Sequence, residues 1–224
     1  FNGRIFAFDE NNTFIVNPNG MLIEDELEGI GCSSKNSIVI TEFGMFFADD
    51  SNIYHYTGEQ TIPLANSILK SNNNVGWLER DKTFNPIVAF DGNKLALVVI
   101  FKQFMSEVEI QEQVQEILNG NNPDNLTVFE IVESLAKYYA WVYNLRLKRW
   151  DRWEIPNGKP LSAISGRDGE LLVSTDESLN FYATNDNDRR DWEWTSKKIT
   201  LGIDGKHKKF YKITSHSNKD NDDF

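Results

Sequence analysis

The side chains that most often carry catalysis or bind metals are few and scattered in this chain. The three histidines, His55, His207 and His216, lack the ligand spacing of a zinc site. The single cysteine, Cys32, has no neighbour that would lower its pKa, so we interpret it as a buried structural thiol. No serine-nucleophile elbow, phosphate-binding glycine loop or dinucleotide fingerprint is present. We therefore predict that the chain is not an enzyme and has no catalytic residue, metal site or cofactor.

One acidic segment resembles a calcium-binding loop. Asp186, Asn187, Asp188 and Asp191 provide the necessary carboxylate density, but glycine is missing at the sixth position and Lys197 stands at the twelfth. We interpret this segment as a solvated loop, and a cation site is the alternative.

Two further groups of side chains have both a structural and a functional interpretation. Trp192 and Trp194 project from one face of a predicted strand, where they either pack between sheets or form a platform for a sugar. A lysine cluster follows, and it either protects a strand edge from aggregation or provides a docking strip for an acidic partner. Its members are Lys197, Lys198, Lys206, Lys208, Lys209 and Lys212.

Most of the chain reads as short strands joined by turns that contain Asp or Asn. The segments 46–56 and 172–182 match when Asp50 is aligned with Asp176, and they indicate a repeat of about 45 residues once a helical insertion is set aside. Sheets of this kind must stack on neighbours to bury both faces. The fold class predicted for residues 1–224 is therefore mainly β, a single propeller-type fragment with antiparallel blades. We expect this partial β-propeller to be an excised or processed piece of a longer protein, because the sequence begins within a predicted strand and stops in a polar segment.

The hydrophobic period changes from strand-like to helical between residues 104 and 137. Apolar residues recur at helical spacing before the stop signal at 119–123, and again in a second short helix. We predict a helical hairpin inserted between strands of one blade, acting as a lid over the adjacent sheet or as an arm that contacts a neighbouring subunit. The expected protein interface comprises Val108, Val114, Leu118, Val132, Lys197, Lys198, Lys208 and Lys209.

The charge balance limits the classes of partner. With 23 basic and 34 acidic side chains, the chain has a formal charge of −11, which argues against attachment to nucleic acid or anionic membrane by charge alone. The longest apolar run, Leu95 to Phe101, is too short to cross a bilayer and predicts a buried strand. The acidic segment Glu24–Glu28 is predicted to be a solvated loop.

Three sequence segments, taken in their order along the chain, resemble the β-propeller of tailed-bacteriophage tail proteins of the nozzle or tail-tubular type. They lie within residues 29–64, 140–153 and 194–213. The insertion at 104–137 departs from the usual blade, and the residues after 215 stop where the family usually continues into further strands. Both departures would suit the large, proteolytically divided muzzle proteins of crAss-like phages.

The resemblance implies a structural virion protein of the viral tail, assembled in the host cytoplasm. It would form a homo-oligomeric ring of about six copies, a six-fold ring around the DNA exit channel. Its partners would be other phage tail proteins and other fragments or copies of the same protein, with DNA only as transit cargo during ejection and no membrane insertion. An acidic lumen would let DNA pass without sticking. The alternative is a glycan-binding or glycan-cleaving β-propeller, which needs convergent carboxylates and aromatic rings at the channel mouth.

Overall fold

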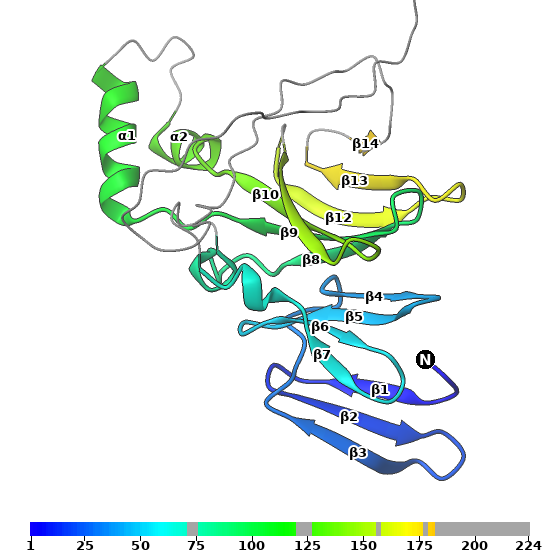
Figure 1. Cartoon of the computed structure of the whole chain (residues 1–224). Coiled ribbons are helices and arrows are strands. Elements are labelled where there is room, and N and C mark those ends of the chain that lie inside the picture. The colour runs from blue at the N-terminus through cyan, green and yellow to red at the C-terminus, as the bar shows by residue number, and fades with distance from the viewer. Residues whose placement is uncertain (71–75, 120–126, 156–157, 177–178, 182–224) are drawn as a thin grey trace, which may run out of the picture. The chain divides into compact units, whose positions relative to one another are not determined.

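A computed structural model describes residues 1–70, 76–119, 127–155, 158–176 and 179–181. Contacts divide the chain into two compact units, Phe1–Thr184 and Asn185–Phe224, and all described residues belong to the first. These residues form a mainly β structure with four antiparallel sheets and two α-helices, none of the sheets being closed on itself (Figure 1). The predicted strands 192–200 and 208–215, the lysine cluster and the acidic loop at 186–191 lie outside the described residues.

Each sheet is a meander in which strands consecutive in the chain pair side by side. Sheet 1 contains β1 (Ile5–Phe8), β2 (Asn12–Asn17) and β3 (Leu22–Glu28). Sheet 2 contains β4 (Ile38–Thr41), β5 (Gly44–Ala48), β6 (Ile53–Tyr56) and β7 (Thr61–Pro63). Sheet 3 contains β8 (Ile87–Asp91), β9 (Ala96–Lys102), β10 (Tyr138–Asn144) and β11 (Arg149–Ile155), and sheet 4 contains β12 (Pro160–Ser165), β13 (Leu171–Thr175) and β14 (Leu179–Phe181).

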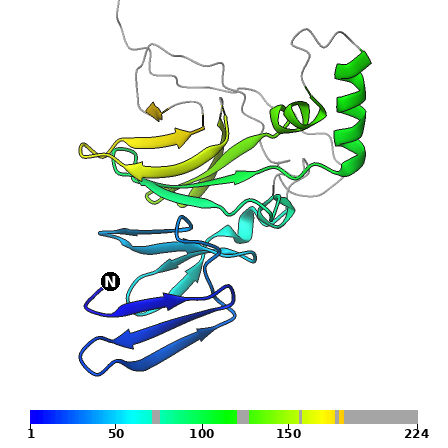
Figure 2. The same cartoon turned by 180° about the vertical axis from the view of Figure 1, so that it is seen from behind.

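The helical elements lie in two connections. The 3-10 helices η1 (Ala65–Ser67) and η2 (Trp77–Glu79) lie between sheets 2 and 3. The α-helices α1 (Glu107–Asn119) and α2 (Val128–Ser134) lie between β9 and β10, so the predicted helical segment is confirmed as an insertion within one sheet. Figures 1 and 2 show both α-helices at one end of sheet 3, away from the β8–β9 and β10–β11 turns.

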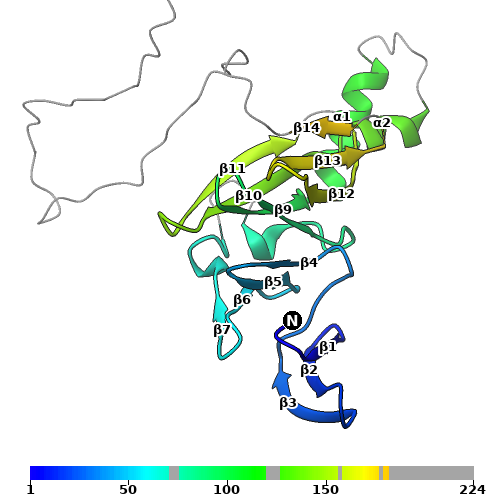
Figure 3. The ribbon, with the colours of Figure 1, turned by 90° about the vertical axis from the view of Figure 1, so that its right-hand side faces the viewer.

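The sheets stack because their strands are apolar on both faces. In β5, Phe47 packs in a cluster with sheet 1, whereas its neighbour Phe46 packs in a cluster with sheet 3. In β9, Val99 faces sheet 2 and Val98 faces sheet 4. Adjacent strand residues point to opposite faces, so a sheet covered on both sides requires a nearly continuous apolar run. The four sheets consequently lie in chain order, as Figure 3 shows.

Aromatic contacts join sheets 1 and 2. The ring of Phe8 lies 5.3 Å from that of Phe47, and the ring of Phe6 lies 5.3 Å from that of Tyr56. Phe46 and Phe47 are fully buried. Burying a side chain of this size stabilises a fold by about 1.5–3 kcal/mol, so these contacts contribute substantially to the stacking.

The first strands of sheets 2, 3 and 4 lie next to one another. β8 contacts both β4 and β12. The amide of Val88 donates to the carbonyl of Asn36 at 2.7 Å, and the side-chain amide of Asn36 donates to the carbonyl of Leu161 at 3.4 Å. Ser165 Oγ also donates to the carbonyl of Phe90. Sheets 2, 3 and 4 therefore lie closest together along their first strands.

An Asp turn occurs in both sheet 1 and sheet 2. Asp49 opens the β5–β6 turn and its Oδ1 accepts hydrogen bonds from the amides of Ser51 and Asn52 at 2.7 and 2.8 Å. Asp9 opens the β1–β2 turn in the same way. The pairs Ala48–Ile53 and Ser174–Leu179 enclose turns of equal length, so the register confirms the alignment of Asp50 with Asp176. In sheet 3 the helical insertion takes the place of this turn.

The prediction of a loop at Glu24–Glu28 is wrong, because these residues belong to β3. The strand pairs with β2 along its length, and a bulge opposite Ile15 and Val16 interrupts the register. β3 is the edge strand of sheet 1 and nearly all its side chains are exposed. Without a buried face it has no alternation of apolar and polar residues that would reveal a strand.

Candidate interaction surface at the helical insertion

The insertion leaves and re-enters sheet 3 at a single point. The last β9 residue, Lys102, pairs with the first β10 residue, Tyr138. The amide of Gln103 donates to the carbonyl of Lys137 at 2.9 Å, which extends the pairing by one step. Because the flanking strands pair up to the insertion, its removal need not disturb the sheet register.

Each helix begins with a capping box. In α1, the carboxylate of Glu109 accepts hydrogen bonds from the amide and hydroxyl of Ser106, both at 2.8 Å. In α2, Glu130 accepts from the amide and hydroxyl of Thr127 at 2.7 and 2.8 Å. The backbone hydrogen bonds are the main reason that the pKa values of Glu109 and Glu130 lie below their usual value. The sequences Ser-x-x-Glu and Thr-x-x-Glu therefore fix where both helices begin.

The expected interface residues of the insertion do not share one environment. Val114 is 7% exposed and is covered within the protein, whereas Val108 is 63% exposed. Leu118 and Val132 are also exposed. Ile131, which was not among the expected interface residues, is fully buried. The apolar residues of α2 recur at helical spacing, and this pattern is the sequence signal that Ile131 is buried. The buried side chains of Val114 and Ile131 hold the two helices in place.

The exposed side of α1 is acidic as well as apolar. The helix contains Glu107, Glu109, Glu112 and Glu116 and has no lysine or arginine within its bounds. Valine and leucine side chains interrupt this acidic surface at Val108 and Leu118. A partner surface with basic side chains around an apolar centre would complement it.

A cavity of about 810 Å³ lies between α2 and the ends of strands in sheets 3 and 4. Its charged lining is mixed, since it comprises Lys102, Glu130, Lys137, Glu154, Lys159 and Asp176. Lys102 Nζ lies 2.9 Å from Asp81 Oδ2 just beside the cavity. Burial would raise the pKa of Asp81, but hydrogen bonds from Lys102 and Thr83 together lower it. Balanced charges of this kind suit a polar contact surface better than a site for one ion.

Arg80 anchors the base of the insertion to sheet 2. Its guanidinium donates to Asp50 Oδ1 at 2.6 Å and to the carbonyl of Trp77 at 3.1 Å, and it lies 4.2 Å from the centre of the Trp77 ring. Arg80 also forms an isolated β-bridge with Gln103. Burial lowers the pKa of Arg80, and Asp50 opposes that shift. Arg80 therefore links the Asp turn of sheet 2, through its side chain, to the start of the insertion, through its backbone.

The residues weighed for chemistry have structural surroundings. Cys32 is buried, its Sγ lies 3.2 Å from the carbonyl oxygen of Ser34, and burial raises the pKa of its thiol. The His55 ring stacks on Phe46 at 4.3 Å, with Nε2 2.8 Å from the carbonyl oxygen of Phe43. Among the described residues, no group of three or more His, Cys, Asp or Glu side chains is placed to hold a metal ion.

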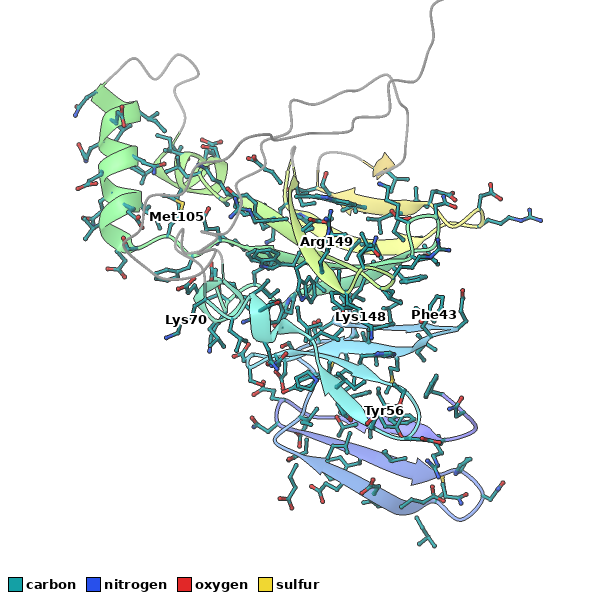
Figure 4. The ribbon with its side chains drawn as sticks, viewed as in Figure 1. Phe43, Tyr56, Lys70, Met105, Lys148 and Arg149 are labelled. Carbon is teal, nitrogen blue, oxygen red and sulfur yellow. The ribbon has the colours of Figure 1, made fainter. Side chains whose placement is uncertain are left out.

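The labelled side chains in Figure 4 show the two ends of the sheets. Met105 lies at the base of α1, whereas Phe43 lies at the β4–β5 turn and Lys148 and Arg149 lie at the β10–β11 turn. Tyr56 lies where sheet 2 meets sheet 1. The insertion is thus presented away from the strand turns at the other end.

No protein-family model matches the chain, and no curated protein matches it. Within the described part of the chain, no helix is both long and apolar enough to cross a membrane.

Proposed function

We propose that this chain is a structural component of a bacteriophage tail, a nozzle or muzzle protein around the DNA exit channel. It acts through contacts with other proteins and not through catalysis. The observation that carries the proposal is the ordered stack of antiparallel meanders whose first strands β4, β8 and β12 lie together. Blades of a β-propeller have this arrangement, with their first strands around a central channel.

The composition of these first strands supports passage of DNA. β4 and β12 contain no charged residue, and β8 contains only Asp91. β8 is buried along its whole length, so only β4 and β12 have side chains open to a channel. A wall without cations gives DNA phosphates no site to bind. The expected acidic lumen does not follow from these strands, because the carboxylates gather on β3 and α1. A nearly uncharged wall replaces it in the proposal.

The positions of the aromatic residues favour a structural protein over a glycan-binding propeller. Trp77 is fully buried, and Trp141 and Trp150 pack in the cluster between sheets 2 and 3. The indole of Trp150 donates to the carbonyl of Leu64 at 3.0 Å. These rings fill the space between sheets and are not available as a sugar platform.

Quantitative mass spectrometry of purified phage particles tests the proposal. We expect peptides of this chain in the particle at about six copies for each tail, and labelling by antibody at the tip of the tail. Purified chain should release no sugar from host polysaccharides. Absence from purified particles, or polysaccharide hydrolysis that one Asp or Glu substitution abolishes, would contradict the proposed function.

A further inference from the structure

The outer face of sheet 1 is built for burial although no described residue covers it. Ile5 of β1 pairs with Val16 of β2, which pairs with Ile23 of β3, so these residues form an aliphatic row across the sheet. The next row contains Ala7 and Phe14. Ile5 and Ile23 are exposed, with 63% of Ile23 open to solvent. Phe6 and Phe8, on the opposite face, pack against sheet 2.

Sheets 2 and 3 show that a sheet with apolar residues on both faces is covered on both sides in this protein. They are likewise apolar on both faces, and each is covered on both sides by a neighbouring sheet. Antiparallel sheets that face water on one side normally alternate apolar and polar residues along each strand. Because sheet 1 keeps apolar residues on its outer face, its strands are suited to a further sheet on that side.

Sheet 4, at the other end of the stack, also has an apolar outer face. Leu171 and Val173 of β13 are buried toward sheet 3, so Leu172 between them points outward. Leu172 pairs with Ile164 of β12, which is 59% exposed. Leu179 of β14 pairs with Ser174 and is also exposed. Among the described residues, aliphatic side chains are therefore exposed on the outer faces of sheets 1 and 4, which lie at opposite ends of the stack of described sheets (Figure 3).

The charges on the two faces favour a contact between sheet 1 and sheet 4 over a contact between two sheet 1 faces. Glu26 pairs with Phe14 and Glu28 pairs with Asn12, so both carboxylates lie on the outer face of sheet 1. Arg4 neutralises only Glu24, at 2.9 Å. Two sheet 1 faces brought together would place like charges opposite one another, which is unfavourable. The β12 strand of sheet 4 has no charged residue between Pro160 and Ser165 and brings no such repulsion.

We propose that the outer face of sheet 1 is covered by the outer face of sheet 4 from a second copy of this chain. The contact continues the sheet-on-sheet packing that joins sheets 1 to 4 within one copy. It is heterologous, because the two surfaces differ, so it generates closed rings where the rotation closes and open filaments where it does not. The inference rests on the proposed function, since it names the partner through which such a tail component assembles.

Two lysine substitutions and one matched control test this contact. Ile23→Lys places a charge on the sheet 1 face, and Ile164→Lys places one on the sheet 4 face. Leu147→Lys makes the same change at a residue that is 62% exposed in the β10–β11 turn, outside both faces. Association of the whole chain is measured by sedimentation velocity, with circular dichroism to confirm that each variant folds. An ammonium group at the centre of an apolar contact should weaken association at least about tenfold.

The decisive measurement mixes the two variants. We expect the wild-type chain and Leu147→Lys to form oligomers, and Ile23→Lys and Ile164→Lys to be monomers when alone. An equal mixture of the two should form dimers only, because each copy then offers one intact face of the opposite kind. A monomeric wild-type chain, unchanged association of either variant, or a mixture that stays monomeric would overturn the contact. Detection of the chain in phage particles alongside any of these results would leave the proposed function in place.

Discussion

At the scale of single residues, buried side chains with several hydrogen bonds hold the turns of this fold. Asp49 is buried and accepts hydrogen bonds from the amide and the hydroxyl of Ser51, both at 2.7 Å, and from the amide of Gly31 at 3.3 Å. Asp9 opens the corresponding turn of sheet 1 but is exposed. The two residues therefore form a natural comparison between a buried and a solvated version of one turn.

We predict that Asp49→Ala lowers the free energy of unfolding by about 2–4 kcal/mol, because it leaves the buried amide of Gly31 and the partly buried amides of the turn without an acceptor. Asp9→Ala is the matched control and should have a clearly smaller effect, since water can replace the lost acceptor. Urea unfolding followed by tryptophan fluorescence measures both. Equal losses from the two substitutions would show that burial of the Asp side chain does not determine how much the turn contributes to the free energy of unfolding.

Arg80 provides a second prediction at this scale. Arg80→Met keeps the packing of the stem but removes the bonds to Asp50 and to the carbonyl of Trp77. Asp50 is largely exposed and stays hydrated after the change, so we expect a loss of about 2–3 kcal/mol, below the usual cost of breaking a fully buried pair. Lys82, whose Nζ lies 3.9 Å from Asp50 Oδ2, is the surface control. Lys82→Met should change the free energy of unfolding by less than about 0.5 kcal/mol in the same urea titration. If Lys82→Met cost as much as Arg80→Met, the loss would come from removing a cation beside Asp50 and not from the buried bonds of Arg80.

At the scale of elements, the insertion can be exchanged for a turn that this chain already contains. Sheets 1 and 2 join the equivalent strands through four-residue turns, 9–12 and 49–52. We predict that replacing residues 104–136 with Asp-Asp-Ser-Asn, the sequence of 49–52, preserves the β signal in circular dichroism and weakens assembly. The physical reason is that Lys102 and Tyr138 already pair on either side of the insertion.

A matched variant separates loss of the arm from general damage. Val108→Ser with Leu118→Ser removes only exposed apolar groups and should leave the unfolding midpoint within experimental error while weakening assembly. Unchanged sedimentation of both the turn exchange and the double variant would show that the insertion is a lid over sheet 3 and not an arm.

The capping boxes make the helices sensitive to acid. Because the folded-state pKa values of Glu109 and Glu130 lie below the ordinary glutamate value of 4.5, their stabilisation is fully present above that pH and is lost as the pH falls through the folded-state values. We predict a reversible loss of ellipticity at 222 nm between about pH 5 and pH 3. Glu109→Gln with Glu130→Gln should flatten this change. Glu112→Gln with Glu116→Gln removes carboxylates beyond the first turn of α1 and should keep it, and equal curves for the two pairs would count against the caps.

The sequence predicted elements well where one physical signal dominated. Alternation, Asp turns and the change of period located nearly all the described strands and both helices. The capping boxes at Ser106 and Thr127 are also visible in the sequence, but they were not used to place the helix starts. β3 was missed because its exposed edge carries no alternation. The candidate surface was only partly predictable, because the helical stripe contains Val108 and Val114 alike. Only the packing of the helices decides that Val114 is covered and Val108 is not.

At the scale of the whole molecule, the buried apolar clusters of the described residues join sheets that are next to one another in the stack. The clusters join sheet 1 to 2, 2 to 3, and 3 to 4. Stability in such an arrangement is approximately the sum of each sheet and its interfaces with its neighbours, as in repeat proteins. A sheet with two interfaces should therefore open less often than a sheet with one.

Hydrogen exchange measures this difference directly. We predict that amides of β5 and β9 exchange most slowly and that those of sheet 1 exchange faster, because sheet 1 loses only one interface when it opens. Phe47→Ala, which removes a buried ring between sheets 1 and 2, should accelerate exchange in sheet 1 far more than in sheet 4. Phe101→Ala removes an equally buried ring in sheet 3 and should not single out sheet 1. Uniform exchange across all four sheets, or equal acceleration by both substitutions, would mean that the stack unfolds as one cooperative unit and that its ends have no separate stability.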